Sequence, residues 1–166
     1  MQRKYLNLFS IAGLVLCLDQ ITKSIVELRL EDGVRYEIIP SLLSVYRSHN
    51  SGFAFGMWKS APQAFQDVFF IGIPVFALVL IVLIFIKLQD NQYLTSIALT
   101  TILAGAVGNL VDRIRYGFVI DFLDIHLGGL FHFPPFNIAD GSIILGVSIM
   151  FLHTLMSGRQ TTRESY

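Results

Sequence analysis

Four long apolar stretches constrain this chain more than any other feature. The hydrocarbon core of a bilayer is about 30 Å thick, so a helix needs roughly 20 mostly apolar residues to cross it. Stretches of this length cover residues 5–28, 68–86, 93–111 and 138–156. We therefore expect an all-α integral membrane protein, in which four transmembrane helices form a single domain over residues 1–166.

The composition agrees with a membrane protein. Hydrophobic residues make up 54% of the chain, charged residues only 14%, and the mean hydropathy is +0.63. A soluble domain usually has about 25% charged residues. Lys plus Arg equals Asp plus Glu, at 12 each, so no basic excess favours nucleic acid as a partner.

The first stretch resembles a secretory signal peptide because Arg3 and Lys4 precede it. However, no small-residue cleavage site follows, and Asp19 interrupts its far end. We expect an uncleaved helix.

Positive charge near the helix ends predicts the orientation. Arg3, Lys87 and Arg159 all fall on one side if four helices cross the membrane. The positive-inside rule then places both termini in the cytoplasm. The other side holds two longer segments, 29–67 and 112–137, whose basic residues count less in this rule because the segments are long.

These two outer segments differ in their expected structure. Segment 29–67 mixes β-branched and aromatic residues with Pro40 and Gly56, which predicts short strands and turns that form a small β-rich cradle. A structured loop without chemistry is the alternative. Segment 112–137 is expected to be helical or loop. Aromatic residues are favoured at membrane interfaces. Segment 29–67 is therefore expected to rest on the outer membrane interface through Phe53, Phe55, Met57 and Trp58.

Polar residues of three predicted helices converge at one depth, near the outer surface. At a rise of 1.5 Å per residue, Asp19 lies about 21 Å along its helix from Tyr5. The later helices place their polar residues at the same end. Burying such groups in a membrane is costly, so their convergence favours a function. The residues concerned are Asp19, Lys23, Asn109, Asp112, Arg113, Asn137 and Asp140.

Simpler explanations exist for each of these residues. Asp19 and Lys23 have the i,i+4 spacing of an ion pair on one helix face. Asp112 and Arg113 could simply mark the end of a helix. Asn137 suits a helix N-cap, and Asp140 would then be a first-turn acid favoured by the helix dipole. Two small residues nearby, four apart, fit a close helix–helix contact: Ala104 and Gly108.

Asp121 supplies a possible partner for Asp140. It stands between Ile120 and Phe122, and an acid in so apolar a setting is expected to be pressed against the membrane or the protein. Asp124 is similar, one helical turn further on. Two carboxylates held close together cannot both ionise easily, so one keeps a proton while the other acts as a base. Such a dyad activates water and protonates a leaving amine without a metal.

Other chemistries find less support. Cys17 has no histidine or lysine near it in sequence, and its apolar run predicts a buried, inert thiol. The histidines lack metal-binding spacing such as HExxH, so neither a metal nor another cofactor is expected. They are His49, His126, His132 and His153.

Four motif blocks carry a family resemblance: LDQITK (18–23), HNSGFAF (49–55), AGAVGNLVDRIRYGFVIDF (104–122) and FNIADGSI (136–143). In this order they resemble the motifs of lipoprotein signal peptidase, signal peptidase II. GNxxDR followed by VxDF is specific, whereas DQxxK alone is weak. The chain departs from the pattern at Phe53, where the family has a small residue, and at Ala104, where it has glycine. Neither position touches the proposed dyad.

This resemblance implies an aspartyl endopeptidase of the bacterial inner membrane. The family removes signal peptides from diacylglyceryl prolipoproteins on the amino side of the lipidated cysteine. The implied partners are these substrates and membrane lipids, and we expect a monomer with its site near the periplasmic face. The resemblance places the dyad on Asp121 and Asp140 and leaves out Asp124. Its other polar motif positions fall on Asp19, Lys23, Asn50, Gly52, Asn109, Asp112, Arg113 and Asn137.

Two other functions remain open. Intramembrane acids with a lysine and an arginine also suit a small transporter or a proton relay. Such relays usually need polar groups through the full depth, and residues 68–86 contain none that is charged. A non-catalytic helper in lipoprotein folding is the third possibility.

Overall fold

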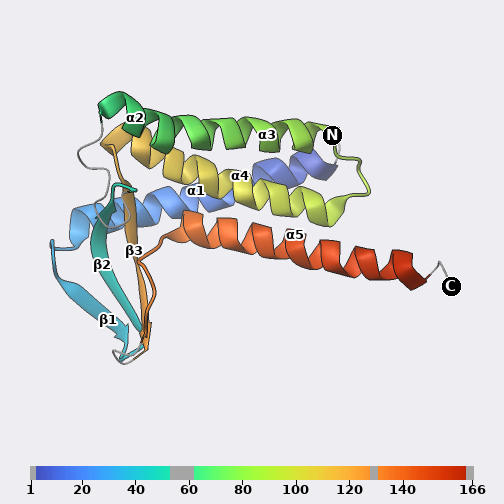
Figure 1. The fold of residues 1–166 in the computed structure, drawn as a ribbon. Helices are drawn as coiled ribbons and strands as arrows, with labels where there is room; N and C mark the ends of the chain where they lie inside the picture. Colours follow the sequence, from blue (N-terminus) through green and yellow to red (C-terminus); the bar gives the residue numbers. More distant parts are fainter. Residues whose placement is uncertain (1–2, 53–61, 128–130, 164–166) are drawn as a thin grey trace.

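Four helical spans dominate the protein, which is described here from a computed structural model covering residues 3–52, 62–127 and 131–163 (Figure 1). In those residues, four helices are long and apolar enough to cross a membrane, which confirms the predicted helical membrane fold. The helical elements are α1 (Arg3–Arg29), α2 (Gln63–Asp67), η2 (Val68–Gly72), α3 (Ile73–Lys87), α4 (Tyr93–Tyr116) and α5 (Ile138–Arg163).

The second span is a composite of α2, η2 and α3. The π-helical turn η2 ends just before α3, where the N–H of Ile73 bonds to the carbonyl of Val68, five residues earlier. Pro74 lies in the first turn of α3. Proline has no N–H donor and disturbs the regular bonding of a helix, and the bonding changes from π-helical to α-helical just before it.

Helix α4 is the centre of the bundle and packs against α1, α3 and α5, whereas in the described residues no Cα atom of α3 lies within 8 Å of one in α5 (Figure 1). Small residues allow the close approach, as predicted for Ala104 and Gly108. A side chain at Gly108 would lie 2.7 Å from a carboxylate oxygen of Asp19, and one at Gly105 would collide with the carbonyl of Ala139. Helices α1 and α5 thus both pack closely against one face of α4.

An antiparallel sheet of order β1-β2-β3-β4 covers one end of the bundle (Figure 1). Its strands are β1 (Arg35–Ile39), β2 (Leu43–Asn50), β3 (Val119–Leu127) and β4 (Phe131–His132). Strands β1 and β2 confirm the predicted β-rich segment. The aromatic group at residues 53, 55, 57 and 58 lies outside the described residues.

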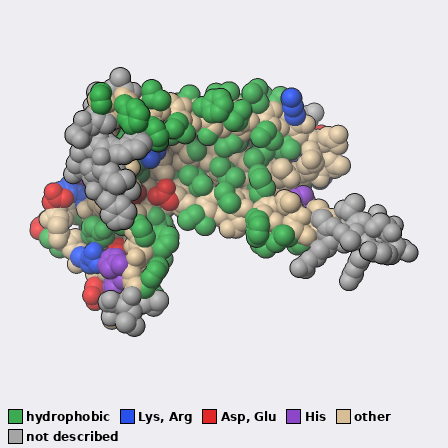
Figure 2. Space-filling model, viewed as in Figure 1, with side chains coloured by type: hydrophobic (Ala, Val, Ile, Leu, Met, Phe, Trp, Pro, Cys, Tyr) green, Lys and Arg blue, Asp and Glu red, His purple; other side chains and the backbone are tan. Residues whose placement is uncertain are grey.

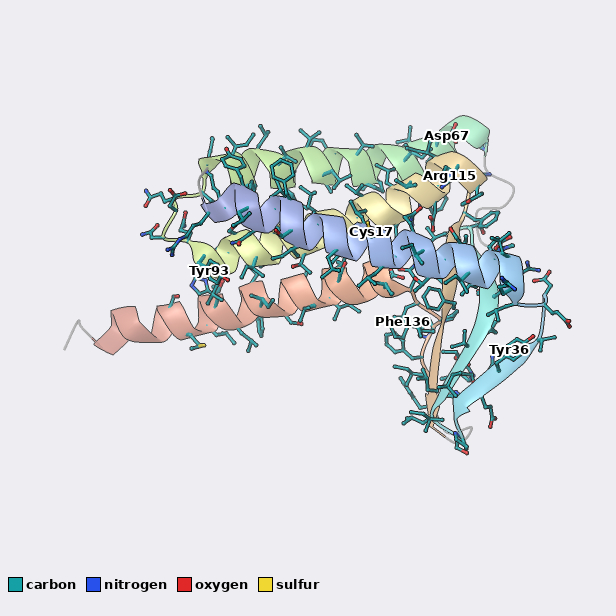
Figure 3. The ribbon with its side chains drawn as sticks, turned by 180° about the vertical axis from the view of Figure 1, so that it is seen from behind. Cys17, Tyr36, Asp67, Tyr93, Arg115 and Phe136 are labelled. Atoms are coloured by element: carbon teal, nitrogen blue, oxygen red, sulfur yellow. The ribbon has the colours of Figure 1, made fainter. Side chains whose placement is uncertain are left out.

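Strand β3 corrects the prediction that segment 112–137 is helical or loop. Gly117, with φ of 79°, ends α4 in a left-handed conformation, and the chain enters β3 almost at once. Backbone hydrogen bonds from Phe122 and Leu123 to the carbonyl of Phe136 then complete the second edge of the strand, and Figure 3 shows Phe136 beside it. Asp124 is therefore three strand residues from Asp121, not one helical turn away.

The two chain termini lie at the end of the bundle opposite the sheet (Figure 1). There the buried Lys4 ammonium donates to the carbonyls of Ile86 and Leu88, at 2.9 and 2.6 Å. These carbonyls belong to the last turn and the C-cap of α3, where a cation is favoured by the helix dipole. Lys4 thereby fixes the start of α1 to the end of α3.

The sides of the bundle are apolar, and Figure 2 shows hydrophobic side chains over the visible face of the helices. Leu14, Phe76 and Phe151 are among many large exposed hydrophobic residues. Cys17, predicted to be a buried thiol, is instead exposed midway along α1 (Figure 3). Apolar residues of a membrane helix face lipid as well as protein, so an apolar sequence neighbourhood does not predict burial.

Substituting Gly105 by alanine is expected to lower stability by about 1–3 kcal/mol, the usual cost of overpacking. Its new methyl group would collide with Ala139 and with the hydroxyl of Ser142. Gly13→Ala is the matched control, because nothing lies within 4 Å of its added carbon. Thermal unfolding of both variants in detergent provides the measurement. Equal melting temperatures for the two variants would show that this packing is not tight.

Candidate active site

The buried ammonium of Lys23 is the centre of a polar cluster between α1 and α4. Its Nζ lies 2.9 Å from a carboxylate oxygen of Asp19 and 2.9 Å from one of Asp112. It donates a third hydrogen bond, also 2.9 Å, to Oδ1 of Asn109. An ammonium has three N–H donors, so this charge is fully satisfied although its side chain is only 2% exposed. The predicted i,i+4 pair is present, and it also reaches α4.

The two acids of this cluster extend it to other elements. The second carboxylate oxygen of Asp19 accepts the backbone N–H of Ala139, at 2.9 Å, in the first turn of α5. Asp112 accepts the N–H of Ile120 at 3.2 Å, in β3. Through these two hydrogen bonds, the ion-paired acids of α1 and α4 connect to α5, which carries Asp140, and to β3, which carries Asp121.

Gln20 belongs to this cluster although the sequence analysis did not select it. Its amide donates to Asp19 at 3.1 Å, to Asp112 at 3.0 Å and to the carbonyl of Gly108 at 3.3 Å. The available signal was a second polar residue beside Asp19 in an otherwise apolar run. Gln20 gives both acids a further donor.

Asn109 and Asn137 connect this cluster to the two candidate catalytic acids. Because Lys23 can only donate, Oδ1 of Asn109 must be its acceptor, which turns the Asn109 amide nitrogen toward Asp140 at 2.7 Å. The amide nitrogen of Asn137 donates to Oδ1 of Asp121 at 2.7 Å and to Asn109 at 3.1 Å. A chain of defined donors therefore runs from the ammonium to both carboxylates.

Asp140 and Asn137 also form a capping box at the start of α5. The Asn137 side chain accepts the N–H of Asp140 at 2.9 Å, and the Asp140 carboxylate accepts the N–H of Asn137 at 3.2 Å. The capping explanation from the sequence is therefore correct. It does not exclude a catalytic one, because the same contacts orient the carboxylate. The Asp140 carboxylate thus receives two N–H donors at the start of α5, one from the Asn109 amide and one from the backbone of Asn137.

Asp121 lies in β3 and is almost completely buried, at 1% exposure. Burial, with a contribution from the charge of Asp140, raises the pKa of the Asp121 carboxyl from 3.8 to about 6. Hydrogen bonds from Asn50 and Asn137 oppose this rise. The two acids thus differ in environment, which is the usual way in which one carboxyl keeps a proton and the other loses it.

Asn50 approaches Asp121 from the end of β2. Its Nδ2 donates to Oδ2 of Asp121 at 2.8 Å, while its Oδ1 accepts the N–H of Gly52 at 2.8 Å. This second bond fixes which end of the amide faces the acid. Gly52 has φ of 79°, a conformation that side chains rarely adopt, and a carbon atom added there would collide with Phe70.

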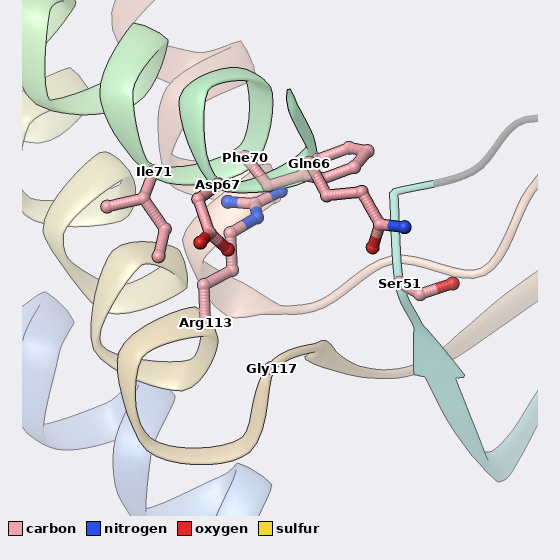
Figure 4. A pocket seen from close by; sticks show the side chains of 7 residues that line it. All are labelled: Ser51, Gln66, Asp67, Phe70, Ile71, Arg113 and Gly117. Carbon is pink, nitrogen blue, oxygen red and sulfur yellow. The ribbon is translucent and has the colours of Figure 1, made fainter. Parts of the chain in front are cut away.

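Arg113 extends into a pocket between α4 and the start of the second span (Figure 4). Its charge interacts with those of Asp140, Asp121 and Asp112. The pocket has both polar and apolar walls, so it is suited to a polar group on a mostly apolar ligand. The pocket is lined by Ser51, Gln66, Asp67, Phe70, Ile71, Arg113 and Gly117.

Asp124 belongs to a separate cluster at the far end of the sheet. It is fully buried and lies 2.7 Å from the guanidinium of Arg35 in β1 and 3.1 Å from His132 in β4. These contacts connect strands on both sides of β3. Across residues 3–52, 62–127 and 131–163, no three side chains of the metal-ligating types gather in a possible metal site.

Comparison with known proteins identifies the family. The family described as Signal peptidase (SPase) II matches residues 11–156, most of the chain. The chain belongs to the signal peptidase II family. It is 40% identical over 159 residues to a lipoprotein signal peptidase of Syntrophus aciditrophicus, covering 95% of this chain and 98% of that one. A lipoprotein signal peptidase of Geobacter metallireducens is 37% identical over 96% of this chain and 97% of its own.

Solved structures of a similar fold exist. Two structures of a bacterial membrane enzyme superpose with TM-scores of 0.78 and 0.79, at 34% and 33% sequence identity. They cover 91% and 89% of this chain, and 88% and 92% of their own. The protein is thus a multi-pass bacterial membrane protein of the signal peptidase II fold.

In this signal peptidase II chain, all ten residues predicted for the site lie where the sheet meets the bundle. Eight of them form a continuous network of hydrogen bonds and ion pairs: Asp19, Lys23, Asn50, Asn109, Asp112, Asp121, Asn137 and Asp140. Gly52 joins through Asn50, and Arg113 through electrostatic interaction with the acids.

Replacing Lys23 by methionine is expected to destabilise the protein by about 3–5 kcal/mol, the usual cost of breaking a buried ion pair. The substitution leaves Asp19 and Asp112 without a counter-charge. Lys87→Met is the matched control because Lys87 is exposed at the end of α3. Thermal unfolding of purified variants is the measurement. If Lys23→Met unfolds at the same temperature as Lys87→Met, the cluster does not hold the helices together.

Proposed function

We propose that this protein removes signal peptides from diacylglyceryl prolipoproteins, on the amino side of the lipidated cysteine, with a water molecule activated between Asp121 and Asp140. The relatives' name, lipoprotein signal peptidase, supports the substrate class. The observation that carries the mechanism is Asn137, which contacts both carboxylates, one through its side chain and one through its backbone. The two acids therefore occupy one site although they come from β3 and α5.

In this proposal the two acids have different roles. Asp140 is the base, because both of its carboxylate oxygens accept hydrogen bonds, one from the Asn109 amide and one from the N–H of Asn137. Asp121 is the acid, because burial raises its pKa to about 6. A carboxyl with a raised pKa beside an ionised one is the usual arrangement for acid–base work at moderate pH.

The reaction proceeds in two steps without a covalent intermediate. Asp140 takes a proton from water as the water oxygen bonds to the scissile carbonyl carbon, and Asp121 gives its proton to the carbonyl oxygen. The C–N bond of the resulting tetrahedral diol then breaks. Asp140 passes its proton to the leaving nitrogen, which becomes the amino group of the lipidated cysteine, and Asp121 regains a proton from the diol. Both acids return to their starting states.

The remaining site residues act on the dyad or the substrate. Asn109 and Asn137 orient the carboxylates through the bonds described above. Arg113, in the pocket of Figure 4, supplies a positive charge for a carbonyl oxygen of the substrate. Lys23, with the acids it pairs, holds the helices rather than the reactants, because its three donors are already used.

The bundle offers a place for an apolar signal helix. Since no described Cα atoms of α3 and α5 come within 8 Å of each other, we place the signal helix on the face of α4 between them. A transmembrane signal peptide placed there would bring its end to the dyad, and the diacylglyceryl group would remain in the membrane. In this orientation both termini are cytoplasmic and the sheet lies on the periplasmic side, as the positive charges predict.

The distribution of polar groups favours hydrolysis over transport. A proton relay needs titratable groups through the membrane. Here the buried acids gather at the sheet end, and α3 consists of apolar residues up to Lys87. A non-catalytic helper would have no use for two acids held together by Asn137.

The dyad is tested by Asp121→Asn and Asp140→Asn. Each should lower the cleavage rate by about 10³-fold or more, since the members of a catalytic unit act together. The measurement is a gel shift of a diacylglyceryl prolipoprotein incubated with purified enzyme in detergent. Asp124→Asn is the matched control and should retain activity, because Asp124 pairs with Arg35 away from the dyad. Cleavage at the wild-type rate by either dyad variant would refute the mechanism.

The pH profile tests which acid holds the proton. Because the pKa of Asp121 is raised to about 6, its proton is kept up to that pH and lost above it, when both acids are ionised. The value of kcat/KM, which reports the free enzyme, should therefore decline above pH about 6. Bound substrate excludes water and raises this pKa further, so kcat should decline at higher pH. A decline of kcat/KM that begins below about pH 5 would contradict this assignment.

A further inference from the structure

Glu27 continues the polar face of α1 beyond the catalytic network. Asp19, Lys23 and Glu27 are spaced four residues apart, so they share one helix face. The first two hold α4 and α5, whereas Glu27 contacts β2. Its carboxylate lies 2.9 Å from Nε2 of His49, and its backbone carbonyl accepts a bond from Arg47 at 3.1 Å.

His49 and Arg47 are fixed from several directions. The His49 ring stacks on Phe118, with ring centroids 4.1 Å apart, just before β3 begins. Arg47 also contacts the carboxylate of Glu27 at 3.8 Å and that of Asp32 at 3.4 Å. Glu27, His49 and Arg47 are all partly exposed, so each pair stabilises the fold by only about 0–1 kcal/mol. Their effect is therefore expected in position more than in stability.

These contacts fall at a β-bulge in β2. Val45 pairs with Leu123 and Ser48 with Asp121, so three steps along β2 match two along β3. Directly paired residues of an antiparallel sheet point to the same face. The extra residue lets Ser48 and Asn50 face the side of Asp121, whereas regular alternation from Val45 would place Arg47 and His49 there. Bulges of this kind often re-aim a side chain beside an active site.

The end of β2 after the bulge carries Asn50, whose amide bonds to Asp121. Asn50 pairs with Val119, and His49 pairs with Ile120. The chain turns away at Gly52, whose N–H holds the other end of the Asn50 amide. Glu27 is thus the anchor on α1 for the strand end that presents Asn50.

We propose that Glu27, acting through His49 and Arg47, is a positioning residue that holds the bulged end of β2 so that Asn50 donates to Asp121. This inference rests on the proposed function of Asp121 as the catalytic acid. Glu27 itself touches neither the dyad nor the expected place of the substrate.

The experiment compares Glu27→Ala, Asn50→Ala and the double variant in the prolipoprotein cleavage assay. We expect Glu27→Ala to lower kcat by about tenfold and to change KM less than twofold, since it acts on the dyad and not on substrate binding. Asn50→Ala should have an equal or larger effect. The double variant should be no slower than Asn50→Ala alone, because both single changes remove the same contact.

The pH profile provides a second measurement that a purely structural role would not affect. The Asn50 hydrogen bond lowers the pKa of Asp121. Losing this hydrogen bond should move the decline of kcat/KM to higher pH in both Asn50→Ala and Glu27→Ala. The double variant should show the same shift as Asn50→Ala. Glu27→Gln keeps an acceptor for His49 and should restore most of the rate. It also tests the proposal if the alanine variant fails to fold.

Glu37→Ala is the matched control, since Glu37 is an exposed acid of β1 in the same sheet. It should leave both kcat and the pH profile unchanged. A Glu27→Ala rate within twofold of wild type would overturn the proposal. The proposal would also be overturned if the double variant were slower than Asn50→Ala by the full factor that Glu27→Ala causes alone. An unchanged pH profile in Glu27→Ala would overturn it as well.

Asp121→Asn, measured alongside, separates this proposal from the proposed function. If Asp121→Asn is inactive while Glu27→Ala is normal, only the positioning role is wrong. If Asp121→Asn still cleaves, the catalytic role of the dyad is wrong, whatever Glu27 does.

Discussion

The burial of one ammonium group determines how the rest of this structure is arranged. Lys23 has no access to water, so each of its three N–H groups needs a protein acceptor. Asp19, Asp112 and Asn109 supply them from α1 and α4. Each of these partners also makes a hydrogen bond that reaches α5 or β3. The site is therefore the consequence of satisfying a charge at the place where helices and sheet meet.

The contacts that fold the protein are also those that orient the two acids proposed to be catalytic. Asn137 caps α5 and, with the same side chain, contacts Asp121. Gly108 lets α1 approach α4, and without that approach the acids of the two helices would not share Lys23. Because structural roles and the proposed catalytic roles coincide in these residues, we expect a change at one of them to affect stability and activity together.

Much of this arrangement was predictable from the sequence, and the exceptions have physical causes. The spans followed from apolar length, and the gathering of Asp19, Lys23, Asn109 and Asp140 followed from their common depth along the helices. Strand β3 was missed because residues 119–124 are buried or half-buried on both faces, which removes the alternation that marks a strand. The bulge in β2 is defined only relative to its partner strand, so no pattern within residues 43–50 reveals it.

The place of Asp140 at the beginning of the last helix has a consequence for the biogenesis of the protein. The ribosome makes α5 after every other element, and its first turn carries one of the two acids. Asp121 therefore waits without its partner while the first three spans enter the membrane. The carboxylates of Asp121 and Asp140 come together only when α5 is in place, so a chain without α5 inserted lacks the pair of acids that we propose to be catalytic.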